Sequence, residues 1–309
     1  MANKIFKIYK KTNVEFFLDG KKIELTKKLF SPIEKIKVAF KIGVVFKIIE
    51  FFVRCKLKLS VSKELSGVSG KIYETIILSF LKPAKEHIFI LNDPDNKMKM
   101  EAKFSEKDSF LSVFRILDNY AKDILINQYN LPNDLSGKLV IDGGANLGEF
   151  AILCGKRGAK VYAFEPLRGT CEILKRQIEI NGLTDRVFPI QMALGDKNEK
   201  LNISYTDSGD PGATLVLSNG ENTELIEVVK LDDFLKEKID LLKLDVEGYE
   251  ENVLNGAKNI IKKDRPVLAL SAYHKPTDMV RLPELIRSID PNYKINYLTQ
   301  GEPIFYCEV

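Results

Sequence analysis

The fold is decided by the stretch Leu139-Val-Ile-Asp142-Gly143-Gly144-Ala145-Asn146-Leu147-Gly148-Glu149-Phe150. An apolar run leads into an acidic residue, then a glycine-rich turn, then the start of a helix. This order is typical of a Rossmann-type fold that opens onto a nucleoside-bearing cofactor. Gly144 and Gly148 are one residue further apart than the last two glycines of the dinucleotide fingerprint. The loop alone therefore leaves the cofactor open.

After Gly137 the sequence alternates between short apolar runs and helical periodicity, which predicts an α/β fold. Pro189 has no amide hydrogen to donate, so the third strand is placed at a sheet edge. The short connection 299–303 makes the last two strands antiparallel. We expect a seven-stranded, mostly parallel sheet in the order 3-2-1-4-5-7-6, with one reversed strand at the C-terminus. Its strands are predicted at 139–142, 160–164, 187–191, 239–246, 266–272, 293–298 and 304–309.

Helices are expected at 148–156, 168–180, 231–235, 248–262 and 277–289, and residues 201–231 look like an insertion with short β-prone pieces. Before Gly137, two strands at 87–91 and 98–104 flank a turn-forming cluster, and a helix follows to about residue 129. We therefore divide the chain into a basic, mostly helical region (1–85), a β-hairpin plus helix (86–136) and the main domain (137–309).

Charge is unevenly distributed along the chain. Up to Lys63 there are 16 Lys and Arg against 5 Asp and Glu, although the whole chain of 309 residues carries only +4. We interpret this basic region as a solvated helical surface, with an anionic partner as the alternative. Its amphipathic run at 31–59 is expected to pack on the protein or on a second copy, with contact to a membrane surface left open. Nucleic-acid binding is not expected, because no aromatic-basic RNA signature is present.

Composition narrows the class of protein further. Charged residues interrupt the apolar stretch at 36–59, so that no uninterrupted apolar run in it approaches the roughly 20 residues needed to span a bilayer. No signal peptide is visible either, so a cytoplasmic enzyme is expected. Four scattered cysteines predict neither a disulfide framework nor a zinc site. Two histidines exclude a His-rich metal site.

Glu165 narrows the choice of cofactor. It lies 21 residues beyond Gly144, at the end of the second strand. An acid at that position accepts hydrogen bonds from both ribose hydroxyls, as in NAD or S-adenosylmethionine (SAM) sites. SAM is favoured by the longer glycine spacing, by the lack of a third glycine for a pyrophosphate and by the reversed C-terminal strand.

Five segments together resemble the FkbM-type SAM-dependent methyltransferases. They are Val140-Ile-Asp-Gly-Gly-Ala-Asn-Leu-Gly148, Ala163-Phe-Glu-Pro166, Ala193-Leu-Gly-Asp196, Leu231-Asp-Asp-Phe234 and Asp240-Leu-Leu-Lys-Leu-Asp-Val-Glu-Gly248. The resemblance covers roughly residues 108–309. It implies the class I methyltransferase fold, SAM as cofactor and O-methylation of sugars or secondary metabolites. It also implies that the methionine and ribose of SAM are lined by Asp142, Gly144, Asn146 and Gly148, the ribose diol is held by Glu165 and the adenine is bordered by Met192 and Ala193.

The catalytic residues are expected at the carboxyl ends of the two central strands, where ligands bind in open α/β sheets. Asp245 and Glu247 follow one strand and His274 the next. His274 is a candidate general base, because an unperturbed imidazole titrates near neutral pH. The two carboxylates could act as base, as acceptors for sugar hydroxyls, or as oxygen ligands for Mg²⁺ or Ca²⁺. We assign no metal ligand from the sequence, and whether the site binds a divalent cation is left open.

The sequence therefore predicts a SAM-dependent O-methyltransferase. Its acceptor would be a hydroxyl of a sugar, a glycan, or a lipid-linked or secondary-metabolite precursor, methylated by direct displacement with a general base. Two alternatives remain open: a non-catalytic SAM-fold module that binds through its basic N-terminal region, and an NAD-dependent oxidoreductase. A homo-oligomer is also open, and the identity of the acceptor is not encoded in these motifs.

Overall fold

The computed structural model describes residues 15–18, 21–23, 87–93, 98–104, 124–205, 222–299 and 302–309. The chain divides into two compact units. The smaller unit contains β1 (Glu15–Leu18), β2 (Lys21–Ile23), most of β3 (His87–Asp93) and the end of β4 (Met98–Phe104). The larger unit contains every element from α5 (Ile124–Gln128) onward.

The strands of the N-terminal half form one sheet in the order β2-β1-β3-β4. β1 pairs antiparallel with both β2 and β3. The two strands expected at 87–91 and 98–104 are confirmed, whereas β1 and β2 were not predicted. The amphipathic run at 31–59 lies outside the described residues, as does most of the helix expected before residue 129. The predicted domain bounds stay a prediction.

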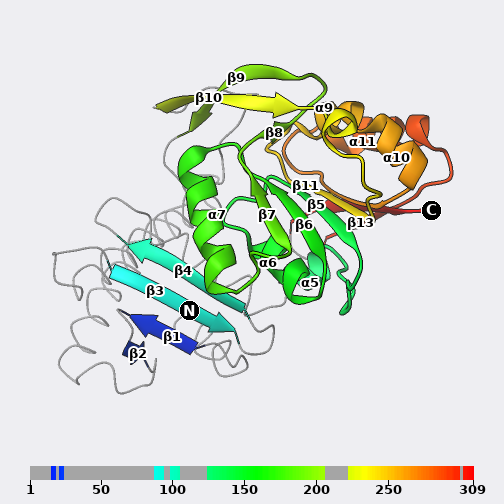
Figure 1. Cartoon of the computed structure of the whole chain (residues 1–309). Coiled ribbons are helices and arrows are strands. Elements are labelled where there is room, and N and C mark those ends of the chain that lie inside the picture. Colours follow the sequence, from blue (N-terminus) through cyan, green and yellow to red (C-terminus); the bar gives the residue numbers. More distant parts are fainter. Residues whose placement is uncertain are drawn as a thin grey trace, which may run out of the picture. The chain divides into compact units, whose positions relative to one another are not determined.

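The larger unit is built on a seven-stranded sheet in the order β13-β14-β12-β11-β5-β6-β7 (Figure 1). Its strands are β5 (Leu139–Gly143), β6 (Lys160–Phe164), β7 (Val187–Ile190), β11 (Leu241–Leu244), β12 (Val267–Ser271), β13 (Lys294–Leu298) and β14 (Ile304–Glu308). All neighbouring pairs from β7 to β12 are parallel, and β14 is antiparallel to both β12 and β13. This is the predicted order, with Pro189 in the edge strand β7, and it is the class I methyltransferase sheet.

The helices of this unit are α6 (Glu149–Lys156), α7 (Arg168–Ile180), α8 (Leu231–Phe234), α9 (Glu250–Gly256), α10 (Lys258–Asp264) and α11 (Asp278–Ile289). The single helix expected at 248–262 is wrong, because it is divided at Ala257 into α9 and α10. A side chain at Gly256 would collide with the backbone oxygen of Gly195. The division therefore lies beside a position where another backbone comes close to the helix.

The insertion forms a second, three-stranded sheet in the order β8-β10-β9. β9 (Glu199–Tyr205) and β10 (Asn222–Val229) pair antiparallel, and β8 (Ala193–Leu194) joins β10 in parallel. A small apolar cluster holds it, with Leu167 at the start of α7 packed against Ile203, Ile226 and Val228. The expected strand at 214–217 and the loop at 207–214 lie outside the described residues.

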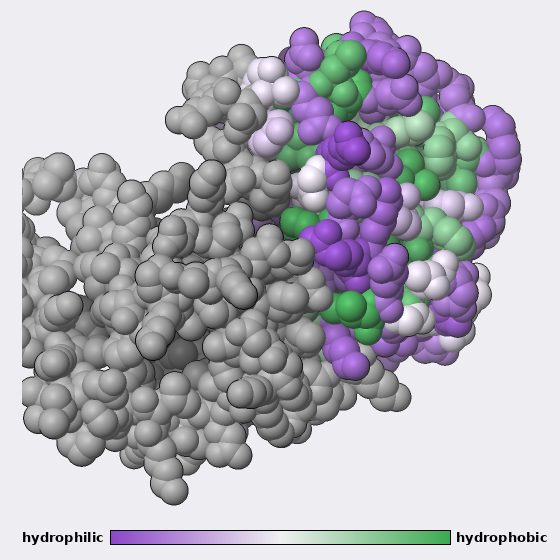
Figure 2. Space-filling model, turned by 60° about the vertical axis from the view of Figure 1, so that its left-hand side comes forward, coloured by the Kyte–Doolittle hydropathy of each residue, from purple (hydrophilic) through white to green (hydrophobic). Residues whose placement is uncertain are grey.

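Apolar residues are concentrated inside the larger unit. Strands β5, β11 and β12 contribute fully buried residues such as Ile141, Leu242 and Leu268, which fits parallel strands covered on both faces. The surface seen in Figure 2 is largely hydrophilic over the described residues, with apolar side chains in separate small patches. None of the described helices is long and apolar enough to cross a membrane. The core fixes the ends of β5, β6, β11 and β12, where the candidate site lies.

Candidate active site

The glycine loop after β5 is held against two neighbouring strands. Gly144 and Ala145 donate backbone hydrogen bonds to the carbonyl oxygen of Phe164 at the end of β6. Gly144 has φ +75°, and a Cβ there would collide with the backbone oxygen of Asp245 just after β11. Gly148 has φ +96° and precedes α6. Both glycines are therefore required by the protein's own packing, in addition to the predicted contact with a cofactor.

Glu165 connects the end of β6 to the glycine loop. Its Oε2 accepts a hydrogen bond from the backbone amide of Asn146 (3.0 Å), and its Oε1 accepts one from Leu167 (3.0 Å). Burial raises the pKa of the carboxyl group to about 7, although both backbone hydrogen bonds act to lower it. A carboxylate has about four acceptor positions, so two remain for a ligand.

Asn146 stands in the left-handed region, with φ +49°. Its buried side-chain oxygen Oδ1 has no hydrogen-bond partner among the described residues. A buried amide oxygen without a partner is unfavourable, and such atoms mark places where a ligand or water binds. This unpartnered oxygen is compatible with the SAM contact predicted for Asn146, which stays a prediction.

Asp142 lies at the carboxyl end of β5 and is completely buried. Its Oδ1 is 2.9 Å from Nζ of Lys243, itself buried in β11, and this amine also donates to the carbonyl oxygen of Gly144 (2.9 Å). Burial raises the pKa of Asp142 against the opposing effect of Lys243. Asp142 therefore holds Lys243, which in turn binds the backbone of the glycine loop. The predicted contact of Asp142 with SAM stays a prediction.

Met192 and Ala193 follow β7, as expected for residues that border an adenine. Met192 is half-buried, and Ala193 begins β8, where it pairs with Val228 of β10. Asn181 is the C-cap of α7, and its side-chain amide donates to the carbonyl oxygen of Gln177 (2.8 Å), in the last turn of the helix.

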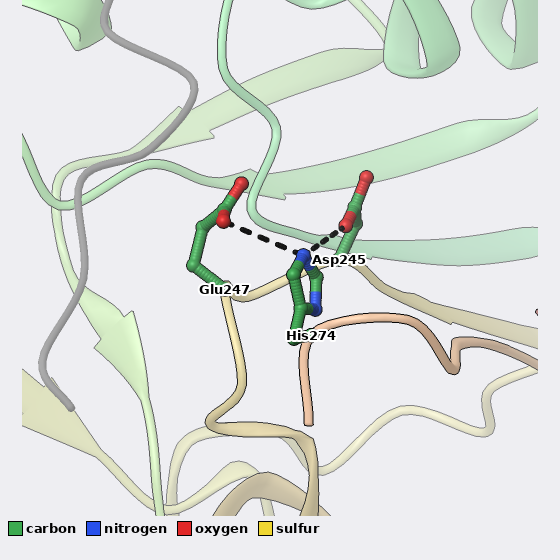
Figure 3. Close-up of side chains that lie close together, drawn as sticks. All are labelled: Asp245, Glu247 and His274. Carbon is green, nitrogen blue, oxygen red and sulfur yellow. Dashed lines mark ion pairs between the residues drawn. The ribbon is translucent and has the colours of Figure 1, made fainter. Parts of the chain in front are cut away.

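The three predicted catalytic residues are close together. Asp245 and Glu247 lie in the turn after β11, and His274 follows β12 (Figure 3). Nε2 of His274 lies 3.5 Å from Oδ1 of Asp245 and 3.4 Å from Oε2 of Glu247. Glu247 has φ +53°, an uncommon backbone conformation for a glutamate. Such strain gathers at functional sites, where the surroundings hold it in place.

The sequence did not identify Glu250 as part of this group. Its buried Oε1 lies 2.9 Å from Nδ1 of His274 and accepts hydrogen bonds from the backbone amides of Val246 (3.1 Å) and Gly248 (3.4 Å). Glu250 is the first residue of α9, so by sequence it looks like an ordinary acid in the first turn of a helix. Only the fold shows that it holds the imidazole ring.

The pKa values of Glu247 and His274 are both raised, but for different physical reasons. Burial raises the pKa of Glu247 to about 7, with the charges of Asp245 and Glu250 acting the same way and His274 opposing them. Burial acts to lower the pKa of His274, but the hydrogen bond to Glu250 and the three carboxylates outweigh it and raise that pKa. The hydroxyl of Tyr273 donates to Oδ1 of Asp245 (3.0 Å). The site can therefore hold and move a proton near neutral pH.

Comparison with known proteins identifies the domain that carries this site. Residues 142–294 match the methyltransferase FkbM domain. The chain therefore carries an FkbM methyltransferase domain, which spans just under half of its length. It is therefore a methyltransferase, and the cofactor of an FkbM methyltransferase is SAM. The alternative of an NAD-dependent oxidoreductase is thereby removed.

Individual relatives cover about half of this FkbM methyltransferase. It is 27% identical over 194 residues to Methyltransferase sdnD of Sordaria araneosa. The match covers 51% of this chain and 70% of that protein. It is 27% identical over 146 residues to the hexuronic acid methyltransferase AglP of Haloferax volcanii. This match covers 46% of this chain and 59% of that protein. The solved structure of Methyltransferase FkbM from Methylobacillus flagellatus matches with a TM-score of 0.47 and 22% identity, over 63% of this chain and 53% of that one.

Proposed function

We propose that this FkbM methyltransferase transfers the methyl group of SAM to a hydroxyl oxygen of a sugar, or of a glycan, lipid-linked or secondary-metabolite precursor. The observation that carries the proposal is the half-buried cluster of Asp245, Glu247 and His274, which follows strands β11 and β12 next to the glycine loop after β5. A hydroxyl is a weak nucleophile until its proton is removed, and this cluster is suited to removing it.

When bound, SAM supplies a sulfonium methyl group whose bond to sulfur breaks as the new bond to oxygen forms, with the electron pair staying on sulfur. The chain's own residues supply the rest. Asn146 and Glu165 would hold the ribose side of SAM at the ends of β5 and β6. The Asp245–Glu247–His274 cluster would bind the acceptor hydroxyl at the ends of the neighbouring strands β11 and β12 and take its proton.

A carbohydrate acceptor is supported by the printed activity of the relative AglP, a hexuronic acid methyltransferase. A hexuronic acid offers two kinds of oxygen, a carboxylate and several hydroxyls. A carboxylate needs no base, because it is already ionised at neutral pH. The proton-accepting cluster of this chain therefore favours a hydroxyl, and the product would be a methyl ether.

The test is transfer of label from methyl-labelled SAM to a panel of neutral sugars, uronic acids and their nucleotide-linked forms. Label that enters the acceptor and survives mild alkali identifies an ether, because a methyl ester is hydrolysed. Alkali-labile label would contradict the hydroxyl acceptor while leaving methyl transfer intact. SAM binding without transfer to any member of the panel would favour the non-catalytic binding module.

A further inference from the structure

The three side chains of the cluster converge on one small region. Asp245, Glu247 and His274 each offer a ligand atom, and these atoms lie within 4.8 Å of one another. In Figure 3 the two carboxylates lie on either side of the imidazole nitrogen, each carried by the turn after β11. Two carboxylate oxygens and one imidazole nitrogen form a ligand set that proteins use for divalent cations.

The contacts of Nε2 in His274 are too long for ordinary hydrogen bonds. They measure 3.4 and 3.5 Å, whereas an N–H···O bond typically spans about 2.7–3.2 Å. The His274 side chain is only 8% exposed, and its Nε2 has no hydrogen-bond partner among the described residues. It is thus a buried nitrogen aimed at two carboxylates without a bond to either.

The same separations suit ligands that share one ion. Oxygen ligands lie about 2.0–2.1 Å from Mg²⁺ and about 2.3–2.6 Å from Ca²⁺, so neighbouring ligand atoms at a right angle are about 2.8–3.0 Å apart around Mg²⁺ and about 3.3–3.7 Å apart around Ca²⁺. The observed distances of 3.4 and 3.5 Å lie within the range for the larger ion and about 0.5 Å above that for the smaller one. Little movement of the side chains is needed to enclose a cation.

The opposite nitrogen of the imidazole is held by a second carboxylate. Nδ1 of His274 is 2.9 Å from Oε1 of Glu250, and Glu250 is 1% exposed. Histidines that bind metals commonly donate their other ring nitrogen to a carboxylate, which fixes the tautomer and the ring orientation. With the proton on Nδ1, the lone pair of Nε2 points between Asp245 and Glu247.

We propose that Asp245, Glu247 and Nε2 of His274 bind a hard divalent cation, a class that includes Ca²⁺, Mn²⁺ and Mg²⁺, with Mn²⁺ as the spectroscopic probe. The three ligands leave further coordination positions, which water and the acceptor oxygen would fill. Its catalytic use rests on the proposed function and changes one step of it. With a cation bound, the three side chains would act as ligands, and the cation would make the acceptor hydroxyl acidic enough to lose its proton to solvent. Without the cation, the cluster itself takes that proton.

Direct binding of Mn²⁺ to the metal-stripped full chain, without SAM or acceptor, tests the site. Electron paramagnetic resonance of free Mn²⁺ should show one bound ion per chain. Asp245→Asn, Glu247→Gln and His274→Ala should each weaken binding by at least tenfold. Glu172→Gln is the matched control, because this exposed carboxylate pairs only with Lys175 on its own helix among the described residues. That variant should bind Mn²⁺ like the unaltered protein.

A second measurement does not depend on the variants folding well. The chain has two histidines, so ring-labelled protein gives two imidazole signals, which His87→Gln assigns. Mn²⁺ should broaden the His274 signals at stoichiometric concentration and leave those of His87 sharp. Equal broadening of both, or no Mn²⁺ binding by a protein that binds SAM, would overturn the cation site. Such a result would leave methyl transfer intact, whereas a bound cation without methyl transfer would instead contradict the proposed function.

Discussion

Nδ1 of His274 lies 2.9 Å from Oε1 of Glu250, and this carboxylate also accepts hydrogen bonds from two backbone amides in the turn that carries Glu247. One buried acid therefore fixes both the ring of His274 and the turn beside it. The relationship joins the ends of β11 and β12, two strands that are neighbours in the sheet. Glu250 acts as a positioning residue for the cluster.

Glu250→Ala should lower methyl transfer by about tenfold to a hundredfold, the range found when a carboxylate behind a functional histidine is removed. SAM affinity should stay within about twofold, because Glu250 contacts neither the glycine loop nor Glu165 among the described contacts. Initial rates and calorimetric SAM titration measure the two effects separately. Glu251→Gln, one residue along α9, serves as the control. An unchanged rate in Glu250→Ala would show that His274 needs no such support.

Glu165 predicts a pH dependence of cofactor binding. Its pKa lies at about 7 in the folded protein, above the ordinary value, so the carboxyl group stays protonated over a pH range in which an exposed glutamate is ionised. Its contribution to stability is therefore present at low pH and is lost as the pH rises from about 4.5 to about 7. Ribose hydroxyls donate best to the ionised form, so SAM affinity should rise between pH 6 and pH 8.

Glu165→Gln should abolish this pH dependence and weaken SAM binding at pH 8 by about tenfold to a hundredfold, as expected for losing hydrogen bonds to a charged group. Calorimetric titration at both pH values measures it. Glu172→Gln is the control, since it removes an exposed carboxylate from the adjoining helix α7. A slope with pH that persists in Glu165→Gln would assign the titration to another group.

The buried pair of Asp142 and Lys243 predicts a stability effect. Lys243→Met removes the charge that pairs with a carboxylate of 0% exposure and should destabilise the protein by about 3–5 kcal/mol. The double variant Asp142→Leu and Lys243→Met should be destabilised less than the sum of the two single variants, because no unpaired charge remains. Urea unfolding of all four proteins gives the coupling energy. Additive effects would contradict the ion pair.

Much of the strand order in the sheet could be predicted, because the features that determine it lie within short segments of the sequence. A proline in the third strand placed that strand at the edge, and a short connection made the last pair antiparallel. Each inference needed only a few adjacent residues. Asp245, Glu247 and His274 could also be placed together, since the carboxyl ends of parallel neighbours meet at one edge of the sheet.

What the sequence could not show depends on contacts between distant segments. Glu250 reaches a ring 24 residues further along the chain, and nothing near it signals this partner. Gly256, next to the division between α9 and α10, has no room for a side chain because of the backbone of Gly195, which is far away in the sequence. The sheet formed by β8, β9 and β10 combines predicted β-prone pieces through a pairing that short apolar runs do not specify.

Gly144 and Gly182 offer a final comparison, because they share a backbone conformation but differ in their surroundings. Their φ angles are +75° and +64°, so alanine is strained at both positions. At Gly182 an added Cβ meets nothing within 4 Å, whereas at Gly144 it collides with the backbone of Asp245. Gly182→Ala should therefore show the conformational effect alone, about 1–2 kcal/mol in the free energy of unfolding.

Gly144→Ala should be destabilised by clearly more than Gly182→Ala, since the loop must move away from the end of β11. That movement shifts the glycine loop relative to Asp245, so SAM affinity and methyl transfer should both fall in Gly144→Ala and stay near normal in Gly182→Ala. Urea unfolding, SAM titration and initial rates measure the three effects. Equal losses of stability in the two variants would show that the glycine loop adjusts to the added methyl group without strain. In that case the contact between the loop and Asp245 does not couple the cofactor side of the site to the acceptor side.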